Sequence, residues 1–176
     1  MPVLSKGSVV DQLPINQIQI NPDPKWASKH WKTLSQVYGK TPYFHKYAPL
    51  LKPCFDSPPA LLSDFTINLI TLIARALGLG DKQFVRSSTL NITGNRSSRL
   101  VKICKHFGAK TYLTGPSANA YLEEDLFREA KIRIEYMEYQ YDEYEQVSPP
   151  FNPYVSILDL MFMTGPDAPR HIWKKE

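Results

Sequence analysis

The stretch FVRSSTLNITGNRSSRLVKICKHFGAKTYLTGPSANAYLEEDLFREAKIRIEYM, residues 84–137, has the clearest pattern in this chain. Three short apolar runs alternate in it with two helical patterns, and Ser, Arg, Gly and Asn crowd the junctions between runs and helices. That alternation predicts β-α-β-α-β units with parallel strands. Ligands of such sheets bind beyond the carboxyl ends of the strands. The sequence therefore predicts an α/β fold with a small, mostly parallel sheet and a ligand site at the junctions.

The apolar periodicity places the individual elements. Within the stretch we expect strands at 84–86, 111–113 and 132–136, and helices at 98–107 and from about 119 to 130. An added helical segment precedes it at 26–77, with helices at 26–38, from 42 toward 51 with an interruption near Pro49, and at 61–77. An edge strand is predicted at 15–20 and a helical stripe at 154–161.

Length and composition indicate one ordinary globular domain spanning residues 1–176. The chain is 43% hydrophobic and 22% charged, which is far from the disordered class, and its net charge is +4. Such mild basicity suits phosphate-bearing small molecules or an anionic membrane surface, and no Lys/Arg-rich block favours nucleic acid. The two cysteines lie outside any metal-ligand spacing, so no metal site is predicted. No apolar run is long enough for a transmembrane span, and we expect a cytoplasmic protein.

Arg86, Ser87 and Ser88 follow the first predicted strand of the stretch. A guanidinium offers a planar fork of donors and serine hydroxyls add short hydrogen bonds, so this junction could clamp a phosphate or a carboxylate. The alternative is a loop arginine that pairs with a local carboxylate, beside two capping serines. Because the residues lie at the carboxyl end of a predicted strand, the two interpretations are about equally supported.

Two further junctions are candidates for ligand binding. The loop from Thr114 to Asn119 follows a strand and contains Gly115, which would let the backbone approach a ligand closely. Neither a dinucleotide fingerprint nor a P-loop is present, and loops of this kind are often built from Gly, Pro and Ser. Arg99 lies near a helix start, where its charge opposes the helix dipole, and this modestly favours a binding role.

His30 and Asp159 are isolated polar residues on apolar helical stripes. A histidine in such a stripe is more often a core residue than a base, and a lone acid there is usually paired with an arginine. Arg86 or Arg99 would be obvious partners for Asp159. No catalytic triad or carboxylate pair can be assembled from the spacing, so the mechanism and any cofactor stay open.

Four separated segments resemble the WbqC-like protein family. They are KHWKTLSQVYGKTPYF (29–44), FVRSSTL (84–90), SSRLVKICKHFGAKTYLTGPSANAYL (97–122) and PYVSILDLMF (153–162). The resemblance runs in the same order from about Val3 to Gly165. Members of the family occur in gene clusters for bacterial O-antigen and other surface polysaccharides, and a glycine transferase role has been suggested.

The resemblance implies a transferase-like protein of surface-polysaccharide (O-antigen) biosynthesis. It would move glycine or another small group to a nucleotide-linked or lipid-linked sugar, and would bind an anionic small molecule or a nucleotide-sugar. The substrate-binding residues expected from the motifs and junctions are Arg86, Ser87, Ser88, Arg99, Gly115, Asn119, Tyr121 and Asp159. His30, which also matches the family, is the one catalytic base that we can name.

One departure from the family concerns the N-terminus. Family members usually begin with a strand and loop of the type QPxxFPxxGYF, followed by an Asp-rich strand and a Trp-containing segment, which this sequence lacks. We therefore expect a fragment, a misassigned start or a reduced relative. The alternative to a transferase is accordingly a non-catalytic binding or assembly partner in a polysaccharide pathway.

Overall fold

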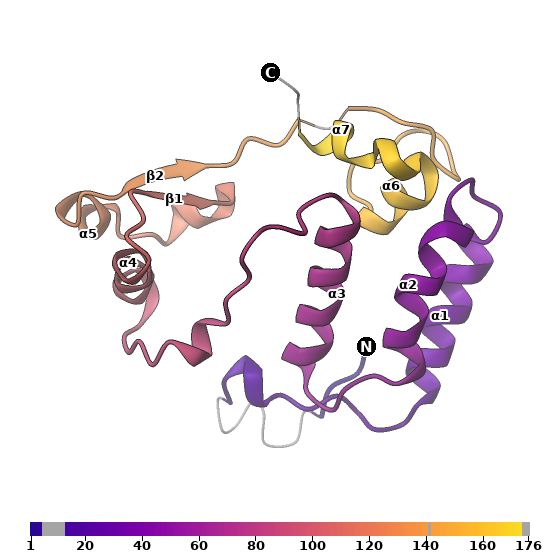
Figure 1. Ribbon diagram of the computed structural model, residues 1–176, viewed down its shortest axis with the longest axis horizontal. Coiled ribbons are helices and arrows are strands. Elements are labelled where there is room, and N and C mark those ends of the chain that lie inside the picture. Colours follow the sequence, from indigo (N-terminus) through magenta and orange to yellow (C-terminus); the bar gives the residue numbers. More distant parts are fainter. Residues whose placement is uncertain (5–12, 141, 174–176) are drawn as a thin grey trace. The chain divides into compact units, whose positions relative to one another are not determined.

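The fold is known from a computed structural model that describes residues 1–4, 13–140 and 142–173 (Figure 1). These residues form two compact units. Unit 1 combines the described parts of 1–83 and 141–176, and unit 2 comprises 84–140. The predicted α/β class is confirmed, because helices are combined with a small parallel sheet. The expectation of a single domain concerns the whole chain and stays a prediction.

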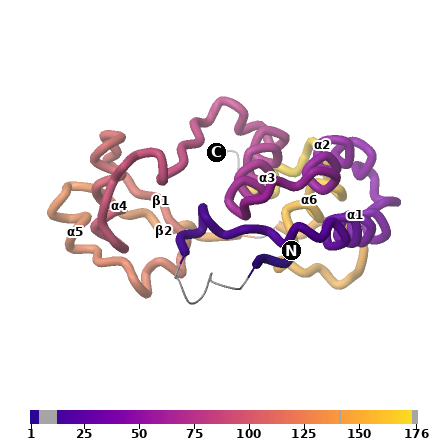
Figure 2. The backbone as a smooth tube through the Cα atoms, turned by 90° about the horizontal axis from the view of Figure 1, so that it is seen from below, coloured from indigo at the N-terminus to yellow at the C-terminus, as the bar shows by residue number. Residues whose placement is uncertain are grey.

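Unit 1 is built from helices. They are α1 (Lys25–Tyr38), α2 (Phe44–Asp56), α3 (Leu62–Ala76), α6 (Ile157–Thr164) and α7 (Ala168–Ile172), with short 3-10 turns at Ile15–Gln17 and Gly165–Asp167. Both backbone views place α1, α2 and α6 close together (Figures 1 and 2). A core forms where α2 contributes Phe44 and Leu51 and α6 contributes Met161 and Phe162. Helices far apart in the sequence are thus held in one unit by apolar burial.

The predicted break of α2 near Pro49 is wrong. The helix continues through Pro49 and Pro53 to Asp56. Each proline removes a backbone hydrogen bond, a cost of about 3 kcal/mol in a helix interior. Both prolines are exposed, whereas the opposite face of α2 buries apolar side chains such as Leu51 and Phe55. Tertiary packing of that face therefore overrides the local preference.

The edge strand predicted at 15–20 forms only in part. Ile15–Gln17 is a 3-10 turn. Isolated antiparallel bridges then join Gln19 to Leu61 and Ile20 to Val3. Because the pairing is limited to single bridges, the β-branched residues do not develop into a continuous strand.

Unit 2 contains one β-α-β arrangement beside a helix. Its elements are α4 (Arg96–His106), β1 (Thr111–Thr114), α5 (Glu124–Glu129) and β2 (Arg133–Tyr136), with 3-10 turns at Ser87–Thr89 and Pro116–Ala120. The strands pair in parallel, from Thr111 with Arg133 to Thr114 with Tyr136. Both helices contribute to a small core that includes Cys104 and Phe127. The thiol of Cys104 is buried, as its apolar neighbours in the sequence predict.

Two expectations for unit 2 are wrong. Residues 84–86 form no strand, and the side chains of Phe84 and Val85 are 47% and 43% exposed. Strand propensity reflects packing on a sheet, and this tripeptide has no β-partner among the described residues. The helix predicted from about 119 begins only at Glu124, after a 3-10 turn. The backbone N–H of Glu123 donates instead to the buried Ser97 hydroxyl on α4, at 2.9 Å.

Candidate functional site

The loop that precedes α4 is fastened to that helix by two cations. Arg99 donates from Nη2 to the Ser87 carbonyl and from Nε to the Ile92 carbonyl, each at 3.1 Å. One turn further, Lys102 donates from Nζ to the Thr93 carbonyl at 3.0 Å. Arg99 and Ser87, both expected as site residues, therefore meet in the structure.

The orientation of α4 follows from its sequence. Ser97, Val101 and Cys104 lie on one face and are at most 7% exposed, so this face packs inward. Arg99 and Lys102 project from the other side of the helix. The loop reaches them through residues with positive φ, including Asn91 at 52° and Gly94 at 130°. Glycine is favoured at the second position because its φ is rarely adopted by other residues.

This part of the chain is basic throughout. Residues 84–122 contain no Asp or Glu, while Lys and Arg occur at 86, 96, 99, 102, 105 and 110. Our interpretation of the sequence selected Arg86 and Arg99 but missed Lys102. Lys102 could have been predicted from its three-residue spacing to Arg99, because this spacing places both side chains on neighbouring parts of one helical surface.

Of the other predicted residues of unit 2, Arg86 and Ser88 are exposed at the 3-10 turn Ser87–Thr89, and three more lie between β1 and α5. Gly115 has an ordinary extended backbone (φ −76°, ψ 159°), and a Cβ added there would lie 3.8 Å from the Tyr139 hydroxyl. The glycine is thus not required by its dihedral angles. Asn119 and Tyr121 are exposed, and Tyr121 reaches 64%. Their roles in substrate binding stay predictions.

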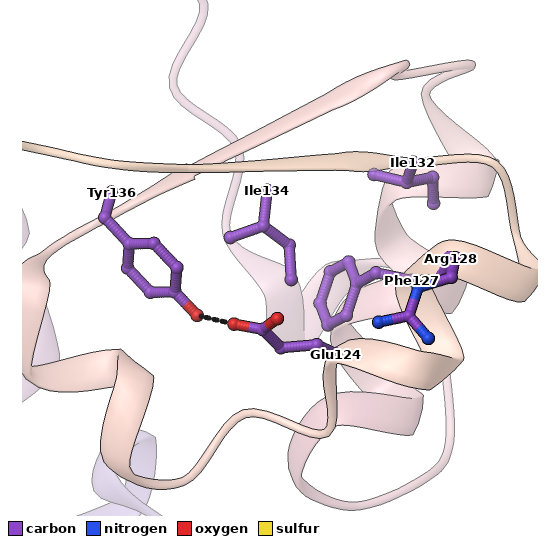
Figure 3. Close-up of a pocket in the computed structure, with 6 residues that line it drawn as sticks. All are labelled: Glu124, Phe127, Arg128, Ile132, Ile134 and Tyr136. Carbon is purple, nitrogen blue, oxygen red and sulfur yellow. Dashed lines mark hydrogen bonds between the residues drawn. The ribbon is translucent and has the colours of Figure 1, made fainter.

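A separate open pocket of about 240 Å³ lies between α5 and β2 (Figure 3). Ile132 and Ile134 line it together with Phe127, and the Tyr136 hydroxyl donates to Glu124 Oε1 at 2.7 Å. This hydrogen bond raises the pKa of Tyr136. The alternation of Ile132, Ile134 and Tyr136 along the strand was the sequence signal for this face. Since Phe127 is 0% exposed, little of the apolar lining is accessible to a ligand.

Asp159 lies in unit 1 in a network of uncharged donors. Its carboxylate accepts hydrogen bonds from the hydroxyls of Tyr38 (3.0 Å) and Tyr144 (2.8 Å) and from the Gln146 amide (3.2 Å). Burial, together with the carboxylate, raises the pKa of both tyrosines to about 12. Asp159 is only 4% exposed. Within its own unit, hydroxyls and an amide thus occupy the place where we expected an arginine, and they connect α1, α6 and the 144–146 segment.

His30 projects from α1 and is exposed at its edge, while its ring lies 5.3 Å from that of Phe55. Partial burial lowers the pKa of His30, so the imidazole is neutral near pH 7 and could accept a proton. Its role as a catalytic base stays a prediction. No group of three or more His, Cys, Asp or Glu side chains that could hold a metal ion occurs among the described residues.

Comparison with known proteins gives two matches. The model of the WbqC-like protein family matches residues 1–171. An uncharacterized protein of Mycobacterium tuberculosis, Rv1507c, is 32% identical over 149 residues, which cover 84% of this chain and 64% of the relative's own length. No solved structure matches the chain significantly. In the described part of the chain, no helix is long and apolar enough to cross a membrane. The extent of the family match shows that this chain belongs to the WbqC-like protein family.

Proposed function

We propose that this chain is a transferase-like protein of bacterial surface-polysaccharide biosynthesis, which binds an anionic donor or a nucleotide-sugar acceptor. Membership of the WbqC-like family is consistent with a polysaccharide-related role. The observation that carries the proposal is the contact between Arg99 and Ser87. It holds a guanidinium at the loop where the sequence predicts an anion site, although the strand expected before that loop does not form.

The chemistry assigned to this site is binding and electrostatic stabilisation. A guanidinium offers paired donors that match a phosphate, and Arg86 and Arg99 would together hold the anionic group of the donor. Catalysis would then consist chiefly of positioning the ligand and stabilising its charge with the same donors. The transferred group would be glycine or another small group. His30 belongs to unit 1 and is proposed as a base by itself, because partial burial lowers its pKa and favours the neutral imidazole.

The test is calorimetric titration with UDP-, GDP- and dTDP-linked sugars. We expect saturable binding of at least one of them, and at least tenfold weaker binding after Arg86→Ala or Arg99→Ala. Arg133→Ala is the matched control, because Arg133 is an exposed arginine of unit 2 that pairs with Glu135. Circular dichroism establishes that each variant is folded. Unchanged binding in both test variants would remove the site assignment.

The alternative, a non-catalytic assembly partner, is favoured by a different observation. Unit 2 exposes several large apolar side chains, among them Phe84, Leu113 and Tyr121, at 47%, 57% and 64%. Exposed apolar side chains are typical of protein interaction sites where they form one contiguous patch. Sedimentation analysis separates the two proposals. A monomer that binds a nucleotide-sugar supports the transferase, whereas a chain that binds none and is soluble only with a second polysaccharide-pathway protein supports the partner.

A further inference from the structure

We propose that Arg99 and Lys102 together form the binding site for a diphosphate group, with Lys102 as an anion-binding residue that the family motifs did not indicate. The inference rests on the proposed function only for the identity of the natural ligand, a nucleoside diphosphate-sugar. The site itself is inferred from the hydrogen bonds and charges around α4.

The two cationic groups donate to consecutive carbonyls of the loop. Arg99 Nε donates to the Ile92 carbonyl and Lys102 Nζ donates to the Thr93 carbonyl, at 3.1 and 3.0 Å. Ile92 and Thr93 are consecutive residues, and Arg99 and Lys102 are three residues apart on one helix. The same short stretch of backbone thus binds both a guanidinium and an ammonium. Each of the two phosphoryl groups of a diphosphate would bind one of the two cations.

The positive charge of this pair is not neutralised by its hydrogen-bond partners. The partners are backbone carbonyls, which carry no net charge, and residues 84–122 contain no Asp or Glu. Other arginines of unit 2 differ in this respect, since Arg128 pairs with Asp125 at 2.5 Å and Arg133 pairs with Glu135. Two positive charges whose hydrogen-bond partners are neutral attract a dianion more strongly than a single one does.

Local stability does not require cations here. Ser87 and Thr93 are exposed, so water could hydrate their carbonyls without a cation. Arg96 and Arg99 also lie in the first turns of α4, where positive charge is unfavourable to the helix. The sequence thus places charge where an uncharged donor would serve the fold.

Enough donors remain to bind a ligand. A guanidinium has five N–H groups, and Arg99 uses two of them for carbonyls, which leaves three. An ammonium has three, and Lys102 uses one, which leaves two. These donors match the oxygen-rich, doubly charged surface of a diphosphate, whereas a single carboxylate would engage only one of the two cations.

The experiment is calorimetric titration of the folded chain with inorganic pyrophosphate, without divalent metal and at fixed ionic strength. The test variant is Lys102→Gln, which removes the charge and keeps a donor for the Thr93 carbonyl. Lys105→Gln is the control, because Lys105 is an exposed lysine on the same helix and the charge change is identical. We expect at least tenfold weaker binding for Lys102→Gln and less than twofold for Lys105→Gln. Arg99→Gln should weaken binding at least as much as Lys102→Gln.

Equal losses in the Lys102 and Lys105 variants would overturn the inference, because they would indicate only a diffuse charge effect. Absence of saturable pyrophosphate binding would overturn it as well. Other outcomes test the proposed function independently of the diphosphate site. If pyrophosphate binds through Lys102 but no nucleotide-sugar binds, the diphosphate site stands and the transferase does not. If a nucleotide-sugar binds equally well to wild type and Lys102→Gln, the transferase stands and the diphosphate site does not.

Discussion

Replacing Asp159 by alanine should destabilise unit 1 strongly. The substitution leaves the hydroxyls of Tyr38 and Tyr144 without their acceptor, whereas the amide of Gln146 still donates to the Asn152 carbonyl. A buried polar group that loses its partner costs about 1–3 kcal/mol, and the half-buried tyrosines recover part of this from water. Loss of a negative charge in the first turn of α6 adds about 0.3–1 kcal/mol. Together these losses predict a decrease of about 3–4 kcal/mol in the free energy of unfolding.

Urea denaturation followed by tryptophan fluorescence measures this effect. All three tryptophans, at 26, 31 and 173, belong to unit 1, so the signal reports on that unit. Asp167→Ala is the control, because Asp167 pairs with Arg170 at 3.1 Å on the exposed surface. Such pairs contribute about 0–1 kcal/mol. A loss below about 1 kcal/mol for Asp159→Ala, or equal losses in the two variants, would refute the reasoning.

Three further outcomes are expected. In Gly165→Ala the new Cβ would lie 2.4 Å from Tyr43 Cδ1, so we expect destabilisation of about 3 kcal/mol. Gly78→Ala is the control, because Gly78 also has a positive φ but has open space around it, and we expect a loss of about 1–2 kcal/mol there. Equal losses of the two variants in thermal unfolding would contradict the clash. Because the pKa of Tyr144 is raised from 10.0 to about 12, the hydroxyl's contribution to stability is complete below pH 10 and is lost as the pH rises through 12. Tyr144→Phe should therefore lose less stability over this alkaline range than the wild type. An unchanged alkaline unfolding profile in Tyr144→Phe would contradict this prediction. The pKa of His30 should lie below 6.5 in an NMR titration. The contribution of His30 to stability is then complete above pH 6.5 and decreases as the pH falls below that value. A measured pKa at or above 6.5 would contradict the partial burial of the imidazole.

The sequence predicted the regular elements where local and tertiary preferences agree. The helix expected at 61–77 is observed at Leu62–Ala76, and the strand expected at 132–136 is observed at Arg133–Tyr136. The apolar periodicity of these segments matches the faces that they bury. The predictions are wrong where tertiary contacts override the local preference of the sequence. Pro49 stays within a helix because the opposite face is buried, and Phe84–Arg86 remains outside any strand although its residues favour strands.

The candidate site was predicted only in part for a similar reason. Their positions at the end of a predicted strand and near a helix start drew attention to Arg86, Ser87 and Arg99, and the structure brings Arg99 and Ser87 together. The donors to Asp159 could not be predicted, because Tyr38 is more than a hundred residues distant in the sequence. Hydrogen bonds of such range depend on how helices pack, which periodicity alone does not specify.

The central claim is that the loop and helix of unit 2 bind the diphosphate of a nucleotide-sugar. The most direct measurement is a titration of the isotope-labelled chain with UDP-, GDP- and dTDP-linked sugars, followed by backbone amide NMR shifts. We predict saturable shifts, for at least one of these ligands, concentrated in residues 86–102 and abolished by Arg99→Gln. Saturable shifts confined to unit 1, or no saturable shift with any of the three ligand classes, would contradict the claim.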